Sequence, residues 1–506
     1  MKIINSVISW FMKKRTHQIE LFKKFPNEVQ QELFEGLVDV SKETEWGIKH
    51  NYQNIKSVKD FKSQVPVQDY ESLRESILKI KHGQQNILWP TEIKWFAKSS
   101  GTTSDKSKFI PITKESLEDC HYKGGKDLLA IYFTKHQDSQ LFAGKALALG
   151  GSSEINKFSP DSYYGDLSSI MIRNLPIWME YARIPDMATS LNPNFEEKIN
   201  TIASCAHKEN VTSLSGVPTW NILLLQKILE VTGKDNLLEI WPNFELYAHG
   251  GVNFKPYQKT FEQFFPSDKV TYIDNYNASE GFFAIQDRWD STEDDMLLML
   301  DYGIFYEFMP MSEVDSINPI TIGLENVELD TNYALIITTN GGLWRYMIGD
   351  TVKFTSLSPF RIQVSGRTKY YINAFGEEVV ADNADKAVAM ACEKSNAIIK
   401  DYTVAPVYFS NNAKGAHEWI LEFEKEPEDA GYFMSIVDNT IKNLNSDYEA
   451  KRYNNLALES PKFHVVPKGT FYRWLKEKGK LGGQNKIPRL SNNRIILESI
   501  LTTMNK

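Results

Sequence analysis

The chain has few cysteines, few histidines and no long apolar run. Its 506 residues include three cysteines, Cys120, Cys205 and Cys392, which are far apart and form no CxxC pair. This spacing argues against a disulfide framework and a Cys/His zinc site, and it favours a reducing cytoplasm. A catalytic cysteine is the less favoured alternative, because a free cysteine usually packs as a small apolar side chain. Nine scattered histidines argue equally against a histidine metal centre.

An excess of positive charge is absent as well. The formal net charge is −8, which argues against a nucleic-acid-coating protein but allows a local basic pocket for a small ligand. Residues 3–12 are apolar but are interrupted by Asn5 and Ser6 and lack a cleavage site, so they predict neither a signal peptide nor a membrane span. Their helical spacing favours a helix packed on the protein. Docking to a membrane surface through the basic residues 13–15 is the alternative.

The chain does contain enough apolar material for a large fold. Hydrophobic residues make up 42% and aromatic residues 12%, and a chain of this length predicts two or three domains. Strand-like and helix-like segments alternate up to about residue 360, which predicts sheets covered by helices. We therefore predict an α/β protein with a large N-terminal domain of helix-covered β-sheets (residues 1–368). A smaller, mobile α+β domain follows (residues 369–506).

Three segments give specific expectations for single elements. Residues 114–133 predict a helix, although Gly124 and Gly125 weaken its middle. Residues 219–233 predict a helix that ends at Gly233. The apolar run 296–310, with its proline end, predicts a strand.

The stretch from Trp95 to Pro111 predicts a loop rich in hydrogen-bond donors between two strands. Residues 99–103 are all serine, threonine or glycine, and Lys106 and Lys108 follow closely. Backbone amides, hydroxyls and ammonium groups together can hold phosphates. The loop lacks the glycine spacing and the following helix of a Walker loop. A solvated hairpin turn is the alternative.

Two further segments have residue types that suit a nucleotide site. Residues 275–283 place Tyr276, Ser279 and Glu280 at the end of a strand, where a ring can lie against a purine and a carboxylate can bind Mg²⁺. Residues 343–354 place Asp350 between a turn and a strand, where its carboxylate can accept both ribose hydroxyls. A surface carboxylate for Glu280 and a turn-capping role for Asp350 are the alternatives.

The order of these segments is more informative than any one of them. "SSGTT", "YNASEG", "RYMIGD" and the late "GGQNKIPRL" occur in the order found in the adenylate-forming superfamily. Over nearly its whole length the chain resembles the Gretchen Hagen (auxin-responsive promoter) family of acyl-acid amido synthetases, and a bacterial member is expected. The resemblance implies ATP-dependent adenylation of a small carboxylic acid, followed by transfer of the acyl group to an amino acid amine, with ATP and Mg²⁺ as cofactors.

The resemblance also implies roles for particular residues. The ATP phosphate loop would comprise Ser99, Ser100, Gly101, Thr102 and Thr103, with Lys108 at its edge. Further ATP contacts would come from Tyr276, Ser279, Asp350 and Arg367, the last near the interdomain hinge. Glu280 would approach Mg²⁺. Lys486 would move in to meet the α-phosphate and the carboxylate, which predicts rotation of the C-terminal domain between the two steps.

The acyl pocket is expected to draw on the helix after Pro111 and on the segments "LGGSS" and "SGVPTW". Val217 and Pro218 would give it apolar walls, although core packing is an equal alternative for both. Gly250 and Gly251 would allow close approach of adenine or the acyl group. The neighbouring His249 is also expected to border the acyl pocket, as a structural histidine rather than as an acid or base.

Two residues depart from the family pattern. Asp105 stands where family members often have glycine, and Met347 stands where many have arginine. Two alternative functions therefore remain: an acyl-CoA ligase that uses the same adenylation step, and a catalytically silent nucleotide-binding relative.

Overall fold

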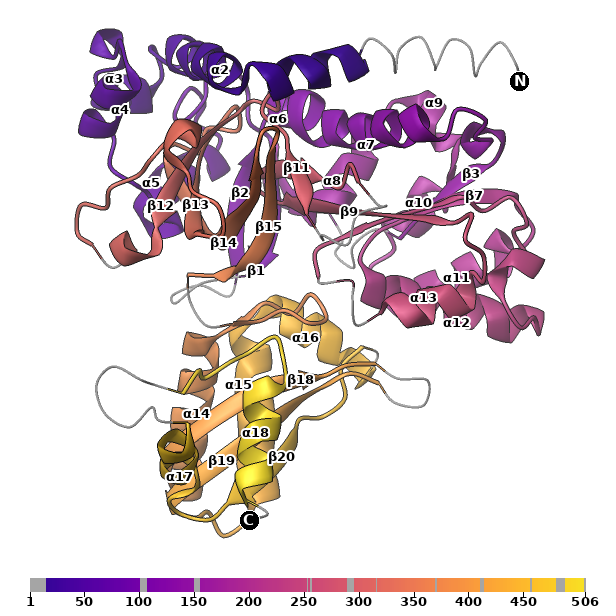
Figure 1. The fold of residues 1–506 in the computed structure, drawn as a ribbon, viewed down its shortest axis with the longest axis vertical. Helices are drawn as coiled ribbons and strands as arrows, with labels where there is room; N and C mark the ends of the chain where they lie inside the picture. Colours follow the sequence, from indigo (N-terminus) through magenta and orange to yellow (C-terminus); the bar gives the residue numbers. More distant parts are fainter. Residues whose placement is uncertain are drawn as a thin grey trace. The chain divides into compact units, whose positions relative to one another are not determined.

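The computed structural model describes most of the chain (Figure 1). The described residues are 15–100, 107–149, 155–252, 254, 257–288, 295–314, 316–368, 371–409, 414–455, 457–478 and 487–504. The chain divides into two compact units, of which the first comprises Met1–Lys98, Phe109–Phe254 and Phe261–Thr368. The second comprises Ser99–Lys108, Lys255–Thr260 and Lys369–Lys506.

A large mixed sheet forms the centre of the first unit. Among the described residues it contains eleven strands. Listed across the sheet, they are β12 (Ile304–Pro310), β13 (Asn332–Thr339), β14 (Tyr346–Leu357), β15 (Phe360–Arg367), β11 (Met296–Leu298), β10 (Gly281–Ile285), β9 (Thr271–Ala278), β8 (Leu246–Gly250), β7 (Val211–Ser215), β3 (Lys145–Ala148) and β6 (Arg183–Ile184). Neighbours from β9 to β6 pair in parallel, whereas those from β12 to β9 pair antiparallel. Strand β9 therefore joins a parallel half to an antiparallel half.

A second, smaller sheet carries the strands on either side of the hydroxyl-rich loop. Its order is β2 (Ser107–Ile112), β1 (Trp95–Ser100), β5 (Ser162–Gly165) and β4 (Asn156–Ser159). The Nζ of Lys81 lies 4.2 Å from the ring centre of Phe109 and 3.9 Å from that of Phe158. This cation–π contact attaches the end of a preceding helix to β2 and β4.

Helices surround these sheets, and their ends follow ordinary capping chemistry. Before residue 300 they are a helix over residues 15–24, α2 (Pro26–Val40), α3 (Glu45–Lys49), α4 (Val58–Gln64), α5 (Tyr70–Lys81), α6 (Lys114–Ser116), the π-helical turn η2 (Leu117–His121), α7 (Tyr122–Lys135), α8 (Leu167–Arg173), α9 (Ile177–Glu180), α10 (Met187–Ser190), α11 (Phe195–Ala206), α12 (Pro218–Thr232) and α13 (Gln258–Phe264). Asp69 caps the N-terminus of α5, because its side chain accepts from the Ser72 N–H. Helix α12 begins with Pro218 and ends at Gly233 in the left-handed conformation, φ 64°, which confirms the prediction for residues 219–233.

The structure corrects three local expectations. The run 296–310 is two strands, β11 and β12, because the chain turns between them. Residues 114–133 are helical, but a π-helical turn separates α6 from α7. Asp350 lies inside β14 rather than between a turn and a strand, since β14 already begins at Tyr346.

The second unit has a three-stranded sheet between two helical layers. Strands β18 (Ile398–Val407), β19 (Ala416–Lys425) and β20 (Lys462–Val466) carry α14 (Ala381–Ser395) and α15 (Ala430–Leu444) on one face and α17 (Thr470–Glu477) and α18 (Ile495–Met504) on the other. Smaller elements of this unit are β16 (Tyr371–Ile372), β17 (Val379–Val380) and α16 (Ser446–Arg452). Alternation along β19 explains the two layers, because Trp419 and Leu421 join the first core and Ile420 joins the second.

These observations confirm the predicted class of a large unit with helix-covered sheets and a smaller α+β unit. Within the described residues, no helix is both long enough and apolar enough to cross a membrane.

Candidate functional site

The most connected group of predicted site residues is centred on Asp350. Its Oδ1 accepts from Arg367 Nε at 2.7 Å, and its Oδ2 accepts from the Tyr276 hydroxyl at 2.7 Å. Asp350 is 7% exposed and Tyr276 is 8% exposed, so these bonds are shielded from water. Such charge-assisted bonds are stronger than neutral ones and fix the direction of the carboxylate.

Three strands bring this group together. Asp350 on β14 lies directly opposite Arg367 on β15. Tyr276 is on β9, and β15, β11 and β10 all lie between β14 and β9 in the sheet order. A 2.7 Å bond across these intervening strands requires a strongly curved sheet. Gly349 adopts φ +99°, a conformation that glycine takes without steric cost, immediately before Asp350.

A two-residue turn next to Tyr276 carries Ser279 and Glu280. Ala278 pairs with Gly281, so β9 and β10 form a hairpin whose loop is Ser279–Glu280. Both loop residues are half-buried. The Glu280 carboxylate contributes to the raised pKa of Tyr276 and of Tyr346, which places its charge near both phenols.

The Tyr276 hydroxyl remains protonated and acts as a donor. Burial, together with the charge and hydrogen bond of Asp350, raises its pKa well above the ordinary value. Its ring centre lies 4.7 Å from that of Phe283. Each Asp350 oxygen has a second lone pair after accepting one bond, so the carboxylate can still accept from a pair of neighbouring hydroxyls.

The five predicted acyl-pocket residues gather at the ends of β7 and β8. Val217 and Pro218 follow β7 and begin α12, whereas His249 and Gly250 end β8 and Gly251 follows. A Cβ placed on Gly251 would lie 3.4 Å from Val217 Cγ2, so the two segments are neighbours. Gly250 pairs with Asn275, the residue before Tyr276. The acyl and nucleotide candidates therefore meet at one edge, formed by the carboxyl ends of parallel strands, where α/β sheets usually bind ligands.

The His249 side chain contacts an aromatic ring and a carboxylate at this edge. Its ring stacks on Phe254 with centres 3.9 Å apart, and its Nδ1 lies 3.5 Å from Asp274 Oδ1. The space beside Gly250 is occupied by Asn275, whose side-chain amide donates to His249 O at 2.6 Å. A Cβ at Gly250 would lie 2.4 Å from Asn275 O, so glycine here allows β8 and β9 to approach each other.

Several predicted residues lie wholly or partly outside the described part of the chain. Ser99 and Ser100 end β1 and Lys108 lies in β2, although the Ser100 side chain is not described. Outside the described residues lie Gly101, Thr102, Thr103, Asp105, Lys106 and Lys486. Met347, the other departure from the family pattern, is half-buried in β14 and packs against a small apolar cluster of Met309, Ala334 and Ile336.

Sequence reasoning missed a buried ion pair in one of the motif segments. Arg345, in the same "RYMIGD" segment, donates from Nε and Nη2 to both Glu307 oxygens at 3.0 Å. It also donates to Val65 O at 2.6 Å, and its side chain is 4% exposed. In the sequence, the available signal was an arginine that directly follows a tryptophan. No group of three or more potential metal-binding side chains occurs among the described residues.

Three family models match the chain. They are the GH3 family N-terminal domain at residues 15–270, the GH3 family central domain at residues 297–367 and the GH3 family C-terminal domain at residues 382–495.

Curated relatives match over most of their length. A jasmonoyl–L-amino acid synthetase of Nicotiana attenuata is 22% identical, covering 93% of this chain and 92% of the relative. An indole-3-acetic acid-amido synthetase of Arabidopsis thaliana is 22% identical, covering 93% and 90%. A 4-substituted benzoates–glutamate ligase of Arabidopsis thaliana is 23% identical, covering 85% and 87%.

Solved structures share the fold. The GH3.15 acyl acid amido synthetase matches with a TM-score of 0.61 at 16% identity, covering 96% of this chain and 95% of that one. A 2-hydroxyisobutyryl-CoA ligase matches with a TM-score of 0.57 at 12% identity, covering 94% and 91%.

Proposed function

Because the chain belongs to the GH3 family, we propose that it joins a small carboxylic acid to an amino acid in an ATP-dependent reaction. The acid first attacks the α-phosphorus of ATP and expels pyrophosphate, which gives an acyl-adenylate. The amine then attacks the acyl carbon and expels AMP. The observation that carries the proposal is the buried Tyr276–Asp350–Arg367 group at the strand edge where the acyl candidates also lie.

Asp350 would bind the ribose. Its carboxylate is fixed by Arg367 and Tyr276, and its remaining lone pairs suit the two adjacent ribose hydroxyls. A pre-oriented acceptor does not have to be ordered when the ligand arrives, so less conformational entropy is lost on binding.

Glu280 would bind Mg²⁺ together with the ATP phosphates. A single protein carboxylate is compatible with this ion, which usually keeps water and phosphate oxygens as its other ligands. Bound there, Mg²⁺ would neutralise phosphate charge as two anions approach each other. Ser279, in the same turn, would add a hydroxyl donor to the phosphates. Lys486 would place its ammonium near the α-phosphate during the first step only, and the C-terminal unit would rotate before the second.

The phosphate loop of residues 99–103, with Lys108 at its edge, would hold the leaving pyrophosphate. Val217, Pro218, His249, Gly250 and Gly251 would border the acyl group. The second step requires no protein nucleophile, since the amine itself attacks the activated acyl carbon. All three cysteines are free, which supports a cytoplasmic location.

The test is acid-dependent release of pyrophosphate from ATP and Mg²⁺. A panel of aryl, indolyl and alkyl carboxylic acids is assayed without an acceptor, with mixed amino acids, and with CoA. Release that depends on one acid and turns over faster with one amino acid is the expected result. Faster turnover with CoA and not with amino acids would identify a thioester-forming ligase instead. ATP binding without release for any acid in the panel would contradict the proposal and favour a silent nucleotide-binding relative.

A further inference from the structure

The first residue after Gly281 in β10 has backbone groups that the sheet does not satisfy. Phe282 pairs with Asn277 at a position where its N–H and C=O point away from β9. On the other side, pairing with β11 ends one residue later, where Phe283 O accepts from Met299 N–H at 2.8 Å. Phe282 is 6% exposed, so unpaired backbone groups at this residue would carry a substantial desolvation cost.

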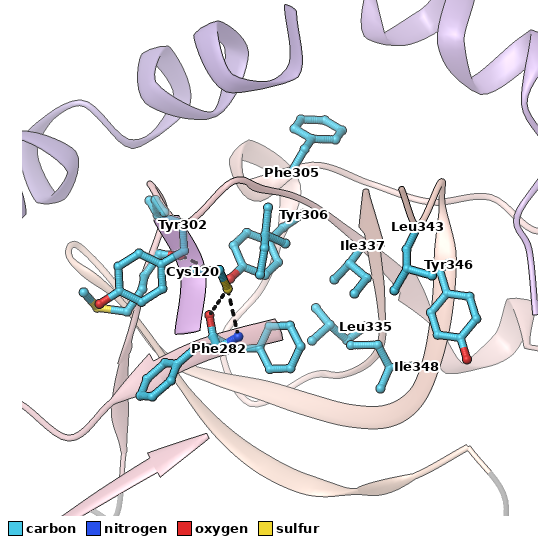
Figure 2. Packing of buried hydrophobic residues seen from close by; sticks show 14 of the residues in the cluster. Cys120, Phe282, Tyr302, Phe305, Tyr306, Leu335, Ile337, Leu343, Tyr346 and Ile348 are labelled. Atoms are coloured by element: carbon cyan, nitrogen blue, oxygen red, sulfur yellow. Dashed lines mark hydrogen bonds between the residues drawn. The ribbon is translucent and has the colours of Figure 1, made fainter. Parts of the chain in front are cut away.

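Cys120 satisfies these groups from the helical layer. Its Sγ accepts from Phe282 N–H at 3.2 Å and lies 3.9 Å from Phe282 O (Figure 2). Cys120 is in the π-helical turn η2, and such turns commonly occur at functional sites. The Cys120 thiol therefore hydrogen-bonds to the Phe282 backbone as a residue of a neighbouring strand would, next to the hairpin that carries Ser279 and Glu280.

Gly124 brings the same helical segment close to the Phe282 side chain. A Cβ at Gly124 would lie 2.5 Å from Cγ of the Phe282 ring, so only glycine allows this contact without movement. The neighbouring Gly125 has nothing within 4 Å of such a Cβ. Phe282 is therefore held at its backbone by Cys120 and at its ring by the surface around Gly124.

We propose that Cys120 and Gly124 are positioning residues that hold the Ser279–Glu280 turn in the geometry that binds the metal–nucleotide complex. The proposal rests on the proposed function, because Glu280 is the residue whose position matters. Cys120 and Gly124 both contact Phe282, which lies two residues after Glu280. The Ser279–Glu280 turn is too short to absorb a displacement of Phe282. Disturbing either contact with Phe282 would weaken metal-dependent nucleotide binding and leave acid recognition unchanged.

The thiol is suited to hydrogen bonding rather than to nucleophilic chemistry. Burial raises the pKa of Cys120 to about 12, so it is a neutral thiol at physiological pH. Its two contacts use the weak donor and the weak acceptor that a thiol offers. This arrangement gives the buried cysteine a role without any covalent step.

The experiment compares matched pairs of variants in the full-length protein. Cys120→Ala removes both contacts, and Cys120→Ser keeps a donor and an acceptor. Cys205→Ala is the control, since the Cys205 thiol donates to Ile202 O of its own helix at 3.4 Å. Gly124→Ala adds a methyl group that clashes with the Phe282 ring. Gly125→Ala makes the same change in helix propensity, but its methyl group contacts no described atom. The readouts are the free Mg²⁺ concentration for half-maximal pyrophosphate release, the KM for the acid, and calorimetric titration with the Mg²⁺–ATP complex.

Cys120→Ala and Gly124→Ala are expected to raise the half-saturating Mg²⁺ concentration about three- to tenfold, equivalent to losing one weak buried hydrogen bond. The acid KM should stay unchanged, and Cys120→Ser, Cys205→Ala and Gly125→Ala should behave like the wild type. Metal dependence equal to the wild type in both test variants would overturn the proposal, as would a change in acid KM instead. If the wild type releases no pyrophosphate, the proposed function fails. The calorimetric titration then decides the positioning role, since it requires no turnover.

Discussion

At the scale of single residues, the Asp350 carboxylate, the proposed ribose acceptor, has a direction fixed by the protein itself. Both oxygens accept from protein donors, and the donors come from separate strands. Replacing Asp350 by asparagine would remove the negative charge. It would also place an amide nitrogen, itself a hydrogen-bond donor, opposite one of these two donors. Because bonds to a charged group contribute about 1.5–3 kcal/mol, we expect Asp350→Asn to raise the ATP KM about ten- to hundredfold.

Tyr276→Phe is the matched comparison for Asp350→Asn. It removes one donor and keeps the ring on Phe283, so we expect only about a three- to tenfold rise in ATP KM. Steady-state kinetics at saturating acid measure both values. An unchanged ATP KM in Asp350→Asn would remove Asp350 from the nucleotide site.

His121 gives a second residue-scale prediction, on stability. It is 2% exposed, neither ring nitrogen has a hydrogen-bond partner within the described part of the chain, and burial lowers its pKa to about 4. As pH falls through 6.5 the unfolded chain binds a proton that the folded chain does not bind until about pH 4. Folding stability is therefore lost on acidification, by about 2 kcal/mol at pH 5.

His121→Leu removes this loss and also removes two unpaired polar atoms. We expect its melting temperature to exceed that of the wild type, and the difference to be larger at pH 5 than at pH 7.5. Thermal melts in matched buffers measure the effect. Equal differences at the two pH values would show that His121 titrates normally in the folded protein.

At the scale of elements, local signals predicted the helices well where caps were clear. Pro218 and Gly233 bracket α12, as the sequence predicted. The failures have physical reasons. One apolar run became β11 and β12, since two short buried strands joined by a turn have the same composition as one long strand. The Cys120 thiol in the π-helical turn bonds to Phe282, which is distant in sequence, so no local pattern could show this contact.

Residues 487–491 show a related dependence on distant partners. They extend the free edge of β18, since Val404 N–H donates to Arg489 O at 2.9 Å and Ser491 N–H donates to Val404 O at 3.0 Å. The Arg489 guanidinium bonds to Asp401, donates to Tyr402 O at 3.2 Å and lies 4.5 Å from the Tyr402 ring centre. This side chain therefore fastens the added strand.

Arg489→Ala should loosen that strand without unfolding the unit. The ion pair and the cation–π contact together predict about three- to tenfold faster hydrogen exchange at the Val404 and Ser491 amides. Arg473→Ala, at an exposed position on α17, is the control. Unchanged exchange would mean that the buried Ile487 and Leu490 side chains hold the segment without Arg489.

At the scale of the whole molecule, the order of four motifs predicted the family and the fold class, although relatives are only about a fifth identical. Each motif supplies side chains of the right chemistry, and their order along the chain is fixed by the fold. The contacts among them were not predictable. The bond between Tyr276 and Asp350 depends on the curvature of a sheet with several strands between them, and curvature leaves no mark in either segment. The proposed acyl pocket is harder still to predict from the sequence, because apolar residues such as Val217 and Pro218 also occur in ordinary protein cores.

The two-step reaction makes a prediction that only the whole molecule can test. If Lys486 neutralises charge during adenylation alone, Lys486→Ala should lower the rate of acyl-adenylate formation about 10²–10³-fold, a typical effect of removing one electrostatic stabiliser. Nucleotide binding should change less than about threefold, because the proposed nucleotide contacts of Asp350, Arg367 and residues 99–103 remain. Transfer from a supplied acyl-adenylate to the amine should also persist, since in the proposal the C-terminal unit has rotated and Lys486 has left the α-phosphate before that step.

Rapid-quench assays of each half-reaction separate these outcomes. Lys478→Ala is the control, since Lys478 is an exposed lysine that directly follows α17. Equal losses in both half-reactions would point to a general disturbance of the C-terminal unit. A normal rate of acyl-adenylate formation would remove Lys486 from the first step. The charge on the α-phosphate would then have to be neutralised from the N-terminal unit, where Arg367 is the cation already fixed beside Asp350.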